Sequence, residues 1–147
     1  VEQVYRGTKR LKPWVKVGIS PFGIWRPGFP PSIQGFDSYE KLAGDSRKWL
    51  REGWVDYFTP QLYWPIARTA QSYPVLLDWW ISENIKGRHM WPGHNSSRAG
   101  SGAAEWAPDE LNNQVRATRE GRGPPVTSSS ACVRSCRRNR HRWPTSC

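Results

Sequence analysis

Six neutral, aromatic or basic side chains stand where three short segments of strand-forming residues end. An aromatic ring can cover one face of a pyranose, an amide can hydrogen-bond two hydroxyl groups, and a guanidinium can bind a carboxylate. The pattern therefore predicts a sugar-binding surface. Its members are Trp25, Arg26, Gln61, Tyr63, Trp64 and His94.

Aromatic residues alone do not decide that prediction, because ten tryptophans in 147 residues suit a large core as well as a sugar platform. Gln61 and Tyr63 alternate with Leu62 in a segment whose other positions are typical of a core, so both are predicted to line the site. Trp64 has two interpretations, a sugar platform or packing at a rim. His94 has three: catalysis, a hydrogen bond to sugar, or a structural role.

Acid–base chemistry on a glycosidic bond usually needs two carboxylates that flank the bond. No acidic residue follows a predicted strand in this chain. Asp56 falls at the beginning of its strand, and the others considered lie on predicted helices. We interpret all of them as solvated or capping side chains: Asp56, Asp78, Glu83, Asp109 and Glu110.

Three cysteines and one histidine near the end of the chain have the residue types of a Cys3His zinc site. They are Cys132, Cys136, His141 and Cys147. The spacing fits known zinc motifs only loosely, and few apolar residues accompany it. A basic tail without fixed structure and a segment read out of frame are the competing interpretations, so we predict no metal and no cofactor.

The net charge of +10 raises the possibility of nucleic-acid binding. All 12 acidic residues lie within residues 1–120, whereas residues 121–147 contain six arginines and no acid. Because the excess charge is concentrated in the tail, nucleic-acid binding is kept only as an alternative. No segment reaches the roughly 18 apolar residues of a membrane-spanning helix, and none resembles a signal peptide at the start.

Periodicity and capping residues predict the elements that would position the candidate side chains. Helices are typical of segments with apolar residues at a period of 3.6, and strands of short β-branched or aromatic runs. Asp37 is expected to cap a helix that Gly53 ends, and Gly87 is expected to end the next one. The predicted order is helix 1–11, strand 15–19, helix 37–52, strand 56–65, helix 73–86, strand 89–94 and helix 108–121.

Strict alternation of helices and strands predicts an α/β fold with a parallel sheet and right-handed crossovers. A complete (β/α)8 TIM barrel needs about 250 residues, so this chain is long enough for only part of one. The segment after Gly121 has no amphipathic period where a further strand would be expected. We predict about three β/α units with flanking helices in residues 1–120, followed by a separate tail in 121–147.

Three ordered segments resemble the bacterial glycosyl-hydrolase-like family 10. They are Lys12–Arg26, Asp45–Tyr57 and Pro60–Pro65, which read KPWVKVGISPFGIWR, DSRKWLREGWVDY and PQLYWP. The resemblance runs from about Val1 to Arg119. It implies a TIM-barrel protein that is secreted or bound to the cell envelope, and some family members act on peptidoglycan glycan strands.

The resemblance also implies that this chain is the later part of the barrel. Family members carry a pair of aspartates, followed by an aromatic residue and Tyr-Pro, at the end of an earlier strand, and this sequence contains no Asp-Asp pair. The chain begins with Val1 rather than Met, so we expect its native start to lie upstream. The acid chemistry is therefore expected outside this chain, whose own residues would hold the glycan.

These observations predict a fragment of a glycoside hydrolase that acts on a bacterial polysaccharide such as peptidoglycan and is inactive alone. A nucleic-acid-binding protein that uses the arginine-rich tail and a non-catalytic carbohydrate-binding module are the alternatives. The open edges of a partial barrel also predict self-association or poor solubility.

Overall fold

The computed structural model describes residues 1–98 and 106–121. Three parallel strands, β1 (Gly18–Ile19), β2 (Tyr57–Phe58) and β3 (His89–Met90), form a sheet in the order β1-β2-β3. Gly18 pairs with Tyr57, which pairs with His89. The chain is therefore a mixed α/β protein with a small parallel sheet, as expected. This arrangement is consistent with part of a TIM barrel.

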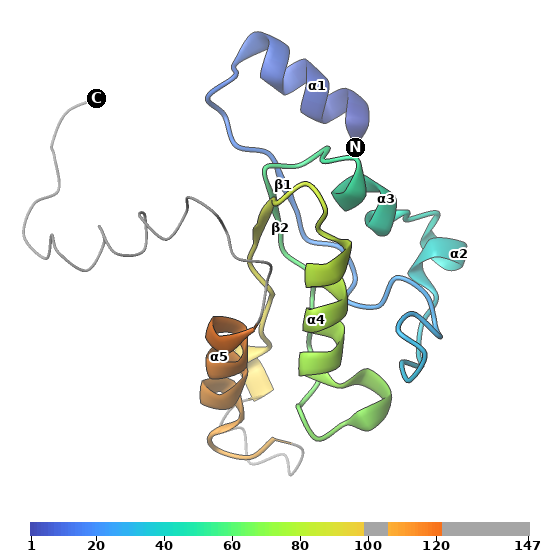
Figure 1. Ribbon diagram of the computed structural model, residues 1–147, viewed down its shortest axis with the longest axis vertical. Helices are drawn as coiled ribbons and strands as arrows, with labels where there is room; N and C mark the ends of the chain where they lie inside the picture. The colour runs from blue at the N-terminus through green and yellow to red at the C-terminus, as the bar shows by residue number, and fades with distance from the viewer. Residues whose placement is uncertain (99–105, 122–147) are drawn as a thin grey trace, which may run out of the picture.

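Helices precede and follow each strand along the chain. The α-helices are α1 (Glu2–Leu11), α2 (Ser38–Leu42), α3 (Ser46–Arg51), α4 (Tyr73–Glu83) and α5 (Glu110–Glu120), and the 3-10 helices are η1 (Thr69–Gln71) and η2 (Ser96–Arg98). Figure 1 shows α4 running alongside the sheet and α1 lying beyond the end at which β1 and β2 begin.

The prediction of one continuous helix over residues 37–52 is wrong. Asp37 does cap the first helix, because its side chain accepts a hydrogen bond from the Glu40 N–H at 2.9 Å. Ala43 then adopts a left-handed conformation with φ 50°, and Asp45 caps a second helix through the Lys48 N–H. Two N-caps within one amphipathic segment thus produce α2 and α3 instead of one helix.

The core lies between the sheet and the helices that cover one of its faces. Phe58 of β2 meets Trp80 of α4 at 4.9 Å between ring centroids, and the Trp80 indole donates a hydrogen bond to the Gly23 carbonyl at 2.8 Å. Burial of these apolar side chains is the main favourable term in folding. The fully buried apolar residues are Ile24, Ile33, Leu50, Val55, Phe58, Leu62, Tyr73, Leu76 and Trp80.

The opposite face of the sheet is open. Because side chains alternate along a strand, Tyr57 and Trp91 point away from Phe58 and its neighbours. Their rings lie 4.8 Å apart, and Trp91 is 55% exposed. The helix α1 also has no buried residue, and its Val4 and Leu11 are exposed. A complete barrel would enclose such a face, which is why the open aromatic surface agrees with the expected partial fold.

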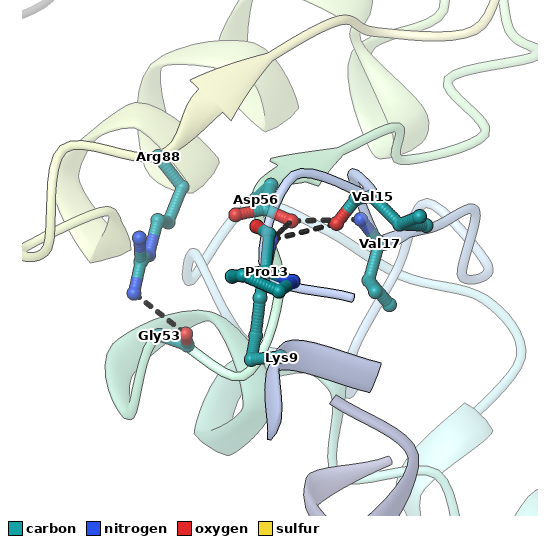
Figure 2. Close-up of polar contacts among 7 residues, drawn as sticks. All are labelled: Lys9, Pro13, Val15, Val17, Gly53, Asp56 and Arg88. Atoms are coloured by element: carbon teal, nitrogen blue, oxygen red, sulfur yellow. Dashed lines mark hydrogen bonds and ion pairs between the residues drawn. The ribbon is translucent and has the colours of Figure 1, made fainter. Parts of the chain in front are cut away.

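The amino edge of the sheet, defined here by Val17, Asp56 and Arg88, is held by charged side chains. Figure 2 shows Lys9 of α1 reaching Asp56, with Nζ–Oδ2 at 2.6 Å, and the Val17 N–H donating to the same oxygen at 2.7 Å. At the same edge, Arg88 donates to the Gly53 carbonyl at 2.8 Å. These contacts attach α1 and the start of β3 to the same end of the sheet.

Candidate functional site

The carboxyl edge of the sheet, defined by Ser20, Phe22, Gln61, Tyr63 and Gly93, is built around the backbone of Gln61. That backbone pairs with Phe22 on one side and with Gly93 on the other, so the parallel pairing extends past the named strands. A Cβ at position 23 would collide with the Gln61 carbonyl, so the close approach of these two segments requires glycine there. Gln61 is therefore placed at the centre of this edge.

The Gln61 amide has a defined orientation. Its Nε2 lies 3.0 Å from the Ser20 carbonyl oxygen and 3.4 Å from Ser20 Oγ. Because a carbonyl can only accept, the amide nitrogen must face Ser20. The amide oxygen makes no hydrogen bond to any residue in 1–98 or 106–121. It is thus available to accept a hydrogen bond from a hydroxyl group of a ligand.

Aromatic residues belong to the segments that pair with or follow Gln61. Phe22 makes edge-to-face contacts with Trp64 and with Phe36, each with ring centroids 5.5 Å apart. Tyr63 is 41% exposed and Phe36 is 44% exposed. Exposed rings of this kind can stack on sugar faces. Neither Phe22 nor Phe36 was expected from the sequence to belong to the site, because their segment reads only as a loop rich in proline and glycine.

His94 joins this edge through α5. Its Nδ1 lies 3.0 Å from Oε1 of Gln114, and its ring stacks on Tyr73 at 5.4 Å between centroids. Gln114 in turn donates from Nε2 to the Trp64 carbonyl at 3.2 Å. The half-buried His94 and the segment that carries Trp64 are therefore tied to the same fully buried glutamine.

Trp25 and Arg26 lie elsewhere. The Trp25 ring is 9% exposed and packs against Trp79 of α4 at 6.1 Å, with the Arg47 guanidinium 5.0 Å from its centroid. Arg26 donates from Nε to Asp37 at 3.2 Å. The structure brings Gln61, Tyr63 and Trp64 together and links His94 to them, whereas Trp25 is part of the core and Arg26 stands at the start of α2.

The sequence comparisons agree with this architecture. Residues 1–103 match the family described as glycosyl hydrolase-like 10. The chain belongs to this glycosyl hydrolase-like family. It is 37% identical to glycosyl hydrolase YngK of Bacillus subtilis (strain 168) over 129 residues, and the matched region covers 82% of this chain and 25% of that protein. It is also 37% identical to glycosyl hydrolase DigH of Escherichia coli (strain K12) over 84 residues, and this region covers 54% of this chain and 19% of that protein. The chain thus spans a quarter or less of the length of these relatives.

Four carboxylates of this glycosyl hydrolase-like chain are held by backbone groups or by other side chains of the protein. Asp37 caps α2, and the Glu40 N–H, aided by Arg26, lowers its pKa below the ordinary value of 3.8. At the amino edge, burial raises the pKa of Asp56, but the hydrogen bonds from Lys9 and Val17 outweigh burial, so the pKa is lowered overall.

Glu83 and Glu110 are buried, which corrects the expectation of solvated or capping side chains. Glu83 pairs with Arg47 at 2.9 Å and with Arg51 at 2.8 Å. Burial opposes its charge, but these two arginines outweigh burial and lower the pKa of Glu83 below 4.5. Glu110 accepts hydrogen bonds from the Ile66 N–H at 2.7 Å and from the side-chain amide of Gln114, on the same helix, at 2.8 Å. Both carboxylates therefore have structural partners.

No group of three metal-binding side chains occurs among residues 1–98 and 106–121. The cysteine and histidine set at 132–147 and the arginine-rich tail lie outside the described residues, so the zinc and nucleic-acid interpretations stay predictions. Within the described part of the glycosyl hydrolase-like chain, no helix is both long and apolar enough to cross a bilayer.

Proposed function

We propose that this chain forms part of the glycan-holding surface of a secreted or cell-envelope glycoside hydrolase that acts on a bacterial polysaccharide such as peptidoglycan glycan strands. The observation that carries the proposal is the Gln61 amide, which Ser20 orients while its oxygen remains available at the carboxyl edge. In parallel β/α folds, this is the edge at which ligands bind. Family membership supplies the reaction class.

Gln61 and Tyr63 perform complementary parts of glycan recognition in this proposal. The amide oxygen accepts a hydrogen bond from a sugar hydroxyl, and the exposed Tyr63 ring covers an apolar sugar face. Trp64 has a less exposed ring that packs on Phe22, so it supports the platform. Trp25 packs in the core and Arg26 pairs with Asp37, so neither is assigned a glycan contact in this proposal.

Hydrolysis requires carboxylates that the described carboxyl edge does not supply, because those assigned above are engaged in caps, ion pairs and backbone contacts. We therefore expect the chain of residues 1–147 to bind glycan without cleaving it. A barrel completed by further β/α units would supply the acid groups and enclose the open face of the sheet.

The test is calorimetric titration of purified peptidoglycan glycan strands into the 147-residue chain, with product analysis of the same mixtures. Gln61→Ala is expected to weaken binding about ten-fold, the equivalent of about 1.4 kcal/mol. Gln3→Ala removes an exposed glutamine side chain from α1 and is the matched control. Equal affinity in both variants would contradict the proposed role of Gln61. Hydrolysis by this chain that is lost in Gln61→Ala would contradict the expectation that the acid groups lie elsewhere.

A further inference from the structure

A connected set of polar side chains behind the carboxyl edge assigns a specific chemical form to His94. We propose that Gln114 is a positioning residue that keeps the proton of neutral His94 on Nδ1, so that Nε2 accepts a hydrogen bond from a glycan hydroxyl. The glycan contact rests on the function proposed above, whereas the position of the proton follows from the hydrogen bonds of Gln114. Neither Gln114 nor its role was predicted from the sequence.

The orientation of the Gln114 amide is decided by the Trp64 carbonyl. Gln114 is completely buried, and one end of its amide lies 3.2 Å from that carbonyl oxygen. A carbonyl cannot donate, so this end must be the nitrogen. The same nitrogen lies 2.8 Å from Oε1 of Glu110. Two acceptors thus face Nε2, and Oε1 is left to face His94.

This orientation determines the tautomer of the imidazole. The Oε1 atom of Gln114 has no hydrogen to give, so the contact of 3.0 Å requires His94 Nδ1 to be the donor. In a neutral ring the other nitrogen is then an acceptor. No further hydrogen bond of His94 occurs within residues 1–98 and 106–121, so Nε2 is unoccupied by the described side chains.

A second chain of hydrogen bonds holds the plane of the same ring. The Thr118 hydroxyl donates to the backbone carbonyl of Gln114 at 2.9 Å and lies 2.7 Å from the Tyr73 hydroxyl. Since the Thr118 proton is already donated, Tyr73 must donate to Thr118. Burial raises the pKa of Tyr73 to about 12, which keeps that proton in place. Tyr73 stacks on His94 with only 18° between the ring planes.

These two contacts fix both the orientation and the tautomer of the His94 ring. Stacking on Tyr73 fixes the plane of the ring, and Gln114 fixes which nitrogen is protonated. The same glutamine bonds the backbone of Trp64, which lies three residues beyond Gln61 along the chain. This arrangement couples the form of the imidazole to the position of the segment that carries the proposed glycan contacts.

The first experiment is a long-range proton–nitrogen NMR spectrum of the nitrogen-labelled 147-residue chain, recorded at a pH where His94 is neutral and without glycan. We expect His94 to be protonated on Nδ1, and the exposed His89 to show the Nε2-protonated form that free histidine favours. A wild-type spectrum with His94 protonated on Nε2 would overturn the proposal without any variant.

The variant test replaces Gln114 by methionine, which has similar length but no amide. Gln114→Met is expected to shift His94 towards protonation on Nε2, whereas Asn112→Ala, an exposed change on the same helix, leaves the tautomer unchanged. If His94 keeps the Nδ1-protonated form in Gln114→Met, Gln114 does not control it and the proposal is wrong.

The glycan contact is read from the same spectrum after peptidoglycan glycan strands are added. A change in the Nε2 resonance of wild-type His94, and about three- to ten-fold weaker binding in Gln114→Met, are expected. Binding that depends on Gln61 but leaves Nε2 unchanged would contradict this inference and leave the proposed function standing. Absence of glycan binding would contradict the proposed function and the glycan contact of His94, but not the measured tautomer.

Discussion

The two edges of the sheet differ in the kind of bond that holds them. At the amino edge, Lys9 and Asp56 form an ion pair, and Arg88 binds a backbone carbonyl. At the carboxyl edge, the contacts are made by neutral amides and aromatic rings, and the Gln61 amide oxygen keeps its acceptor capacity. The amino edge is thus held by charged groups that are paired within the protein, whereas the carboxyl edge has an amide oxygen with no hydrogen bond to the described residues. In β/α barrels the two edges carry stability and activity respectively.

Asp56→Ala is expected to have the largest effect, a loss of about 2–3 kcal/mol in the free energy of unfolding. The change leaves the partly buried Lys9 ammonium without its carboxylate and the Val17 N–H without an acceptor. Urea denaturation monitored by circular dichroism measures the loss, and the affinity of the folded protein for glycan should not change.

Glu2→Gln provides the control for that prediction. It breaks the exposed ion pair between Glu2 and Arg6 on α1, so it should cost less than about 0.5 kcal/mol. If Asp56→Ala proves equally mild, the amino edge does not have the stabilising role assigned to it.

Gly23→Ala should produce an intermediate effect that tests the carboxyl edge. The added Cβ meets the Gln61 carbonyl, so one segment must move, at an expected cost of about 1–3 kcal/mol together with weaker glycan binding. Gly7→Ala is the matched control, since no atom lies near that position on α1 and alanine favours a helix. If Gly23→Ala lowers stability but leaves the affinity for glycan unchanged, the close approach at Gly23 is not needed for glycan binding.

Acidification should also weaken the fold, because protonation discharges the carboxylates of Asp56 and Glu83 while their side chains stay in place. The pKa of Asp56 is lowered from 3.8 and that of Glu83 from 4.5. Both groups therefore stabilise the fold above their ordinary pKa values, and this stabilisation is lost as the pH falls through the lowered ones. Thermal unfolding of the wild type between pH 6 and about pH 3 should reveal the loss, and Asp56→Asn should reduce it. The same pH dependence in both proteins would exclude a contribution from Asp56.

Elements whose signals are local could be predicted from the sequence. The sequence correctly predicts the cap at Asp37, the left-handed Gly53 and the apolar face of α4 that contains Leu76 and Trp80. Each of these features depends on residues within a few positions. The break between α2 and α3 was missed because the amphipathic period continues across it, while the second cap at Asp45 was read as an ordinary helical position.

The candidate site was predicted only in part, because its contacts join distant segments. Gln61 could be placed from its strand, but Gln114 bonds the Trp64 carbonyl 50 positions away. An amide on a helix gives no local sign of such a partner, so the polar buried face of α5 was not foreseen. Trp25 shows the converse: an aromatic residue after a strand can turn into the core as readily as towards a ligand, and its type does not indicate its direction.

The left-handed Ala43 between α2 and α3 has a consequence for how this sequence can evolve. A non-glycine residue in that conformation costs about 1 kcal/mol, and the glycine that would avoid the cost stands one position later, at Gly44. Ala43 is exposed and lies at neither edge of the sheet. Exchange of Ala43 for glycine would therefore relieve this cost without touching either edge of the sheet, so it is open to descendants that must offset destabilising changes elsewhere.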